Sequence, residues 1–254
     1  MQILGGIDNL GIRPTAATGL IKGVALVLSR LPHENIRAVM KALCALSLGP
    51  LQALLEQHAS NPLKISKFSV SDPVLYLDRL SAILSNINPK VADGQSHPCT
   101  DVVVSDIWPV ISAVCGAFIS DTRIMERTCR TIRFSVRSLG LQSAPLLEPL
   151  VKQMVGLYQS HPHSCFLYLG SILVDEYAHL DVCITGLLEM LSAFAPATFA
   201  LLIPPVNSET TATPEKSLRA HPDTVDDFFR SGHLIIFFNL LFVKKMLICQ
   251  RANQ

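Results

Sequence analysis

Apolar residues recur at helical spacing along almost the whole chain, and this feature restricts the possible folds more than any other. Alternation of apolar and polar residues with a period of two, the pattern of a half-buried strand, never persists beyond a few residues. Leucine, isoleucine, valine and alanine supply the packing, while aromatic residues make up only 6% of the chain. This usage suits helices packed on helices better than packed sheets. The sequence therefore predicts an all-α fold.

Prolines and capping residues divide the helical pattern into segments. Ser71-Asp72-Pro73 has the form of a helix start, with a capping side chain followed by proline in the first turn. Asp121 is predicted to cap a later helix, and Gly140 is predicted to end it. Because proline lacks the backbone N–H, Pro109 should bend its helix and Pro50 should kink or split another.

The predicted helices fall into consecutive pairs. These pairs cover residues 15–58, 73–118, 122–160 and 163–203. Each is close to the period of about 40–47 residues found in HEAT and armadillo repeats. We therefore expect a HEAT-repeat α-solenoid of antiparallel helix pairs, with roughly four to five repeats over residues 1–230. An irregular helical bundle remains the alternative.

Two segments depart from the repeat pattern. Residues 204–221 are rich in Ser, Thr and Pro and are predicted to form a flexible loop within the solenoid. Residues 231–254 are predicted to be a divergent apolar tail outside the native solenoid. The apolar run in this tail, Leu234–Val243, has ten residues with Asn239 inside it, whereas a membrane-spanning helix needs about 20. No membrane insertion is therefore predicted.

Cysteine usage and net charge restrict the compartment and the type of partner. The seven cysteines are odd in number, form no CxxC pair and mostly lie in apolar helical runs. Such cysteines are typical of a reducing compartment, so the cytosol or the nucleus is expected. The formal net charge is only +1, so electrostatic recognition of a partner must come from a local cluster.

One predicted helix carries such a cluster, a row of arginines on a single face. At about 100° per residue, the five side chains fall within an arc of roughly 120°. Met125, Ile132, Val136 and Leu139 occupy the opposite side, so that side should be buried. The row, called the arginine stripe below, consists of Arg123, Arg127, Arg130, Arg133 and Arg137.

Guanidinium groups bind phosphates and carboxylates through paired, charge-assisted hydrogen bonds. An extended acidic or phosphorylated peptide is therefore the ligand that the arginine stripe suggests. The spacing leaves open that the face is merely solvated, or that neighbouring acids neutralise the arginines in a purely structural scaffold. Nucleic acid is a weaker candidate, because no aromatic residues that could stack on bases are interleaved with the arginines.

No motif predicts catalysis, a metal site or a cofactor. His161, His163 and Cys165 match no standard zinc spacing, and neither do His97 and Cys99. The sequence also lacks a nucleophile elbow and a phosphate-binding loop. The protein is therefore expected not to be an enzyme.

Several stretches closely resemble the transportin-SR receptors of the importin-β superfamily. The resemblance extends from about Gly11 to Arg230, and importin thirteen, a close relative, is the second choice. The most specific stretches are HSCFLYLGSILVDEY (163–177) and HPDTVDDFFR (221–230), followed by RIMERTCRTIRFSVRSLG (123–140) and DPVLYLDRLSAIL (72–84).

This resemblance implies a nuclear import receptor that shuttles between cytoplasm and nucleus. Its expected cargo is splicing factors with arginine-serine-rich, often phosphorylated, segments, and Ran-GTP releases that cargo. In this family an arginine-rich helix holds the acidic cargo segment, and all five residues of the arginine stripe match positions in it. The family's receptors are far longer, so Ran and nucleoporins are expected partners of the full-length receptor. Direct binding of nucleic acid is not expected.

Overall fold

The computed structural model describes residues 11–202, apart from 63, 68 and 93, and residues 218–230. All the regular elements within these residues are helices, which confirms the predicted all-α fold. The chain divides into two compact units, Met1–Leu146 and Leu147–Gln254. The predicted tail, 231–254, and most of the predicted loop lie outside the described residues.

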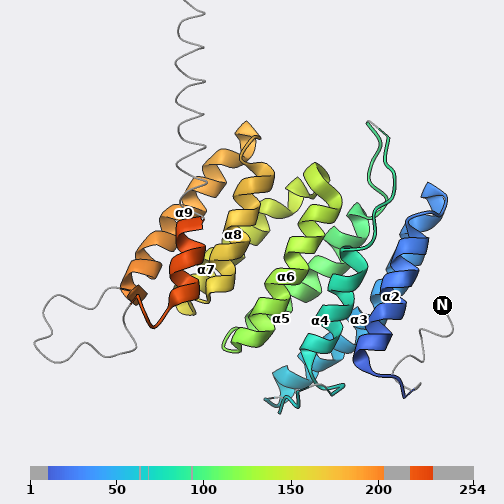
Figure 1. Ribbon diagram of the computed structural model, residues 1–254, viewed down its shortest axis with the longest axis horizontal. Coiled ribbons are helices and arrows are strands. Elements are labelled where there is room, and N and C mark those ends of the chain that lie inside the picture. Colours follow the sequence, from blue (N-terminus) through green and yellow to red (C-terminus); the bar gives the residue numbers. More distant parts are fainter. Residues whose placement is uncertain (1–10, 63, 68, 93, 203–217, 231–254) are drawn as a thin grey trace, which may run out of the picture. The chain divides into compact units, whose positions relative to one another are not determined.

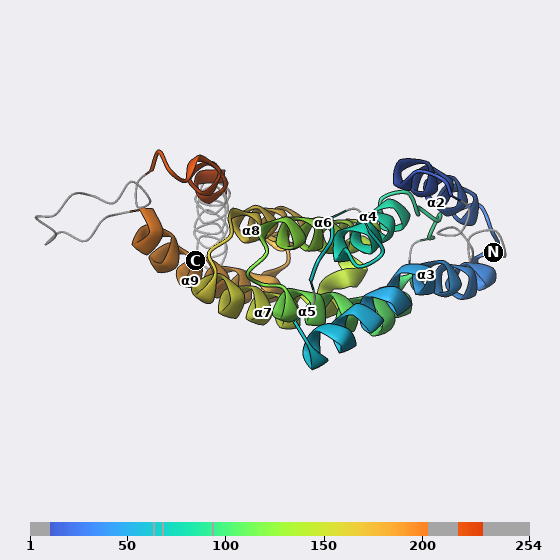
Figure 2. The same ribbon diagram turned by 90° about the horizontal axis from the view of Figure 1, so that it is seen from below.

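The first unit is built from two layers of helices (Figures 1 and 2). Helices α2, α4 and α6 lie side by side in one layer, and α3 and α5 form the other. Helix α4 is buried on nearly every side, because it contacts α2, α3 and α6. The elements are α2 (Pro14–Leu28), α3 (His33–Ser60), α4 (Pro73–Leu84), the π-helical η2 (Val102–Ile107), α5 (Trp108–Ala117), α6 (Thr122–Leu139) and the 3₁₀-helical η3 (Gly140–Leu146).

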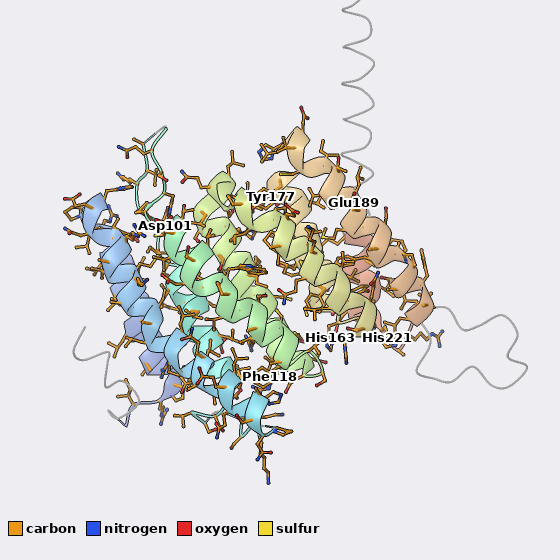
Figure 3. All side chains as sticks on the ribbon, turned by 180° about the vertical axis from the view of Figure 1, so that it is seen from behind. Asp101, Phe118, His163, Tyr177, Glu189 and His221 are labelled. Atoms are coloured by element: carbon orange, nitrogen blue, oxygen red, sulfur yellow. The ribbon has the colours of Figure 1, made fainter. Side chains whose placement is uncertain are left out.

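An ion pair at one end of α3 and a contact between two rings at the other connect this helix to the η2–α5 segment. Near its start, Arg37 Nη2 lies 3.1 Å from Asp101 Oδ2, just before η2. Near its end, the rings of His58 and Phe118 have centroids 4.6 Å apart. Figure 3 labels Asp101 and Phe118, at opposite ends of the η2–α5 segment.

The second unit contains α7 (Leu147–Ser160), α8 (Ser164–Tyr177), α9 (Asp181–Leu202) and a helix at residues 222–230. Helix α9 packs on both α7 and α8. Tyr158 and Phe194 form its aromatic core with ring centroids 4.7 Å apart, and Tyr177 ends α8 as a buried side chain (Figure 3). The 222–230 helix contacts α9 through Phe228, whose ring centroid is 5.4 Å from that of the partly exposed Phe199.

The structure confirms the three helix ends that were predicted from a capping residue or a terminal glycine. Asp72 caps α4 by accepting a hydrogen bond from the Val74 N–H, and Pro73 follows at the first helical position. Asp121 caps α6 by accepting from the Ile124 N–H. Gly140 ends α6 with φ of 54°, a left-handed conformation that glycine adopts without a steric penalty.

Prolines lie in or beside three of the helices. At Pro109, six π-helical residues precede Trp108 and accommodate the ring and the missing N–H. Helix α3 continues through Pro50 without splitting, since the buried Leu48 and Leu51 hold both sides of it in the core. Within the predicted pair 122–160, a 3₁₀ segment that contains Pro145 separates the two helices, and α7 begins only at Leu147.

Among the described residues, two helices, α3 and α9, are long and apolar enough to cross a membrane by length and composition alone. Their apolar windows are 39% and 28% buried, respectively. Core helices of this kind pass the same test, and α3 packs against α2, α4 and α5.

The helices that begin successive pairs start at residues 14, 73, 122 and 164. These intervals are longer than the period of about 34 residues in TPR arrays and nearer the period of about 40–47 in HEAT arrays. The chain therefore has the all-α, helix-pair architecture of HEAT- and TPR-like solenoids.

Candidate functional site

Helix α6 separates a buried side from a charged side, as its sequence predicts. Met125, Ile132, Val136 and Leu139 are all buried. The buried side packs against α4, where Thr131 Oγ1 lies 2.9 Å from Ser81 Oγ and donates to the Leu77 carbonyl at 3.2 Å. This packing fixes the rotation of α6 and leaves every residue of the arginine stripe at least partly exposed.

A groove with a volume of about 560 Å³ runs between α2 and α6. Its floor is the outer face of α4, including Val74, Asp78 and Ser81. Lys22 and Thr18 of α2 line the opposite wall. The α6 wall consists of the first three residues of the arginine stripe, Arg123, Arg127 and Arg130.

Arg123 is held tightly at one end of this groove. Its Nη1 and Nη2 atoms donate to the two carboxylate oxygens of Asp72 at 2.9 and 3.0 Å. The Asp72 side chain is only 1% exposed, so the pair is largely shielded from solvent. The hydrogen bond to Asp72 raises the pKa of Arg123, and Arg123 therefore remains charged. This arginine anchors α6 to the start of α4.

Arg127 is held more loosely at the centre of the groove. Its Nη1 atom lies 3.6 Å from Asp78 Oδ1, which is too far for a good hydrogen bond. Both side chains are more than a third exposed, at 38% and 37%. The Nε atom of Arg127 is buried without a hydrogen-bond acceptor among the described residues. The guanidinium therefore has unused hydrogen-bonding capacity.

The remaining three arginines continue along the same face. Arg130 is exposed, and no described carboxylate lies within ion-pair distance of it. The guanidinium carbons of Arg130 and Arg133 lie 5.7 and 4.6 Å from the centroid of the Phe134 ring. Such contacts help to orient a guanidinium group. Arg137 is exposed in the last turn of α6, where a cation also suits the helix dipole.

The structure adds three charged residues to the site that the sequence did not assign to it: Lys22, Asp72 and Asp78. Asp72 was predicted only as a helix cap. The two aspartates lie about 50 residues before their arginine partners in the chain, and only the packing of α4 on α6 brings them together. The regular spacing of Val74, Asp78 and Ser81 on one helix face was the only available signal, and it does not identify the neighbouring helix.

The histidines and cysteines considered for metal binding or nucleophilic chemistry form no such site among the described residues. His161 and His163 lie in the turn between α7 and α8, with their rings stacked 6.2 Å apart. Within the described part of the chain, no group of three His, Cys, Asp or Glu side chains could hold a metal ion. Burial raises the pKa of the Cys99 thiol to about 12 and also raises the pKa of Cys44, opposite to what a reactive thiolate needs.

Similarity to known proteins covers most of the chain. Residues 97–202 match the sequence model of a family described as the transportin-3/importin-13 fourth TPR domain. Transportin MOS14 of Arabidopsis thaliana is 22% identical over 232 residues, 90% of this chain. Importin-13 of Rattus norvegicus is 27% identical over 129 residues, and importin-13 of Homo sapiens is 26% identical over the same length, 51% of this chain.

The chain spans 21% of the length of Transportin MOS14 and 12% of the length of the importin-13 proteins. The segment matched by the family model includes all of α6 and therefore the whole arginine stripe. Both a transportin and importin-13 are among the relatives, so the matches do not choose between them. The chain is thus similar to a limited segment of proteins of the transportin and importin-13 kind.

Proposed function

We propose that this chain is a segment of a nuclear transport receptor that binds arginine-serine-rich protein cargo through the arginine stripe of α6. The names transportin and importin describe carriers, and the segment that matches their family model contains α6. Phosphorylated or acidic cargo segments supply the anions that guanidinium groups bind best.

The observation that carries this proposal is the supply of exposed guanidinium N–H groups beside a groove. Arg127 and Arg130 line the groove, with one loosely paired and the other without a described ion-pair partner. The groove volume of about 560 Å³ lies within the range of ligand-binding clefts, about 300–1,000 Å³. Charge-assisted bonds from successive arginines would then bind successive phosphates.

The wider role follows from the relatives and belongs to the same proposal. In the full-length receptor, Ran and nucleoporins would be partners, and the protein would shuttle between cytoplasm and nucleus. Neither a direct nucleic-acid ligand nor membrane insertion is part of this role, and no catalytic step or cofactor is required.

A purely structural role is the second candidate, and one observation favours it for one residue. Arg123 donates two hydrogen bonds to the buried carboxylate of Asp72. We assign Arg123 to positioning α6 rather than to direct contact with a ligand. The ligand contacts are assigned to Arg127, Arg130, Arg133 and Arg137.

A fluorescence-anisotropy titration with a phosphorylated arginine-serine peptide tests the proposal. The test variant carries Arg127→Ala, Arg130→Ala and Arg133→Ala. A control variant, with Arg30→Ala, Arg37→Ala and Lys152→Ala, loses the same charge from exposed sites on other faces. We expect salt-sensitive binding to the wild type and the control, and a loss of roughly tenfold or more in the test variant. Equal binding to both variants would support the structural role.

A further inference from the structure

The floor of the groove carries a carboxylate, Asp78, which would repel a purely anionic ligand. Asp78 lies on α4 between Val74 and Ser81, and all three residues line the groove. Its side chain is 37% exposed, and its only described ion-pair partner is Arg127, at 3.6 Å. The other carboxylate in the groove, Asp72, is 1% exposed and is occupied by Arg123. Asp78 is therefore the acid that a ligand in this groove would meet.

The groove presents charges of opposite sign on different surfaces. Arg127 and Arg130 lie on the α6 wall, whereas Asp78 lies on the floor. Side chains of an extended peptide point alternately to opposite sides. A peptide with anions on one side and cations on the other can therefore place its anions on α6 and its cations over α4. A peptide with anions alone brings negative charge close to Asp78, which is unfavourable.

From this arrangement, and resting on the proposed function, we propose that Asp78 is a specificity-determining residue that selects ligands with alternating cations and phosphates. An arginine of the ligand pairs with Asp78, and Arg127, released from its long contact with Asp78, binds the neighbouring phosphate. The groove thus favours peptides of alternating arginine and phosphoserine over peptides that are only acidic.

The test compares two peptides of equal length and equal phosphate content. One alternates arginine with phosphoserine, and the other alternates glutamine with phosphoserine. Simple attraction to the arginine stripe favours the glutamine peptide, because it carries more net negative charge. The proposal predicts the opposite order, with tighter binding of the arginine peptide by the wild type.

Asp78→Asn then isolates the contribution of the carboxylate while keeping the shape of the side chain. We expect this variant to lower the preference for the arginine peptide by roughly threefold or more, as for a partly exposed ion pair. Asp101→Asn is the matched control, because Asp101 is exposed, makes an ion pair with Arg37 and is not part of the groove. This control should keep the wild-type preference, and circular dichroism should show both variants folded.

Two results would overturn the proposal while leaving the proposed function intact. One is tighter binding of the glutamine peptide by the wild type, and the other is an unchanged preference in Asp78→Asn. If neither peptide binds the folded wild type, the proposed function fails and the role of Asp78 fails with it.

Discussion

The residues of the arginine stripe differ in burial and in their ion-pair partners, and we propose different roles for them on that basis. Arg123 is mostly covered and bonded to a buried carboxylate, whereas Arg130 is exposed beside the groove. Removing one partner of a shielded ion pair leaves an uncompensated charge, which costs far more than removing an exposed one. Stability measurements can therefore distinguish a positioning arginine from a ligand-binding arginine without any ligand.

Arg123→Ala should lower the free energy of unfolding by about 2 kcal/mol, because it leaves the Asp72 carboxylate buried without its guanidinium partner. Arg130→Ala should change stability by no more than about 0.5 kcal/mol, since no described ion pair is lost. Urea denaturation followed by circular dichroism measures both values. Similar losses in the two variants would contradict the separation of roles.

Asp227 provides a prediction on pH dependence in the second unit. Burial, reinforced by Asp226 and Asp223 and opposed by Arg230, raises the pKa of Asp227 from 3.8 to about 6. The folded state thus holds the proton more tightly than the unfolded state. The neutral carboxyl favours folding at low pH, and this contribution is lost as pH rises from about 4 through about 6.

Asp227→Asn should therefore melt at a higher temperature than the wild type at pH 7.5, with the difference closing as pH falls to 4.5. The expected gain at pH 7.5 is about 1 kcal/mol, because the carboxyl remains partly exposed and solvent screens the effect. Glu148→Gln, at an exposed carboxylate paired with Lys152, is the control and should show no such gain. A difference that grows at low pH would contradict the raised pKa.

At the scale of helices, the sequence predicts those features that depend on a few neighbouring residues. The caps at Asp72 and Asp121 and the end at Gly140 follow from side-chain chemistry within one turn, and the structure confirms them. The π-helical turn before Pro109 and the late start of α7 were not predicted, because each depends on how the helix packs as a whole. The pairing of Asp78 with Arg127 is likewise a consequence of α4 packing on α6.

The contact between α8 and α9 gives a prediction on packing. A Cβ atom at Gly170 would lie 3.1 Å from Phe194 Cε2 and 3.3 Å from Met190 Cε. Phe194 is fully buried against Tyr158, so it has little room to move. We expect Gly170→Ala to destabilise the protein by about 1 kcal/mol, with overpacking outweighing the better helix propensity of alanine.

Gly156→Ala on the exposed side of α7 is the matched substitution. No atom lies within 4 Å of its added Cβ, so alanine should stabilise the protein by roughly 0.5–1 kcal/mol. Thermal denaturation of the two variants measures the difference. A stabilised Gly170→Ala would mean that α8 and α9 can separate to admit a methyl group.

At the scale of the whole molecule, the chain is nearly neutral but its charges are concentrated locally. The chain carries a formal net charge of only +1, yet four cations and two carboxylates line a single groove. The chain spans 21% of the length of Transportin MOS14. The proposed function places a phosphorylated peptide on one surface, the groove beside α6, and finding where the peptide binds tests it.

Photo-cross-linking tests this claim most directly. A phosphorylated arginine-serine peptide with a photoreactive group at its centre would be irradiated on the folded chain, and the attachment sites would be identified by mass spectrometry. We expect the peptide to attach to α6 and to the groove-facing residues of α2 and α4. Unlabelled phosphopeptide should compete with this attachment. Attachment that unlabelled phosphopeptide prevents, but that occurs only within Leu147–Gln254, would contradict the proposed function, because the arginine stripe would then not be the binding surface.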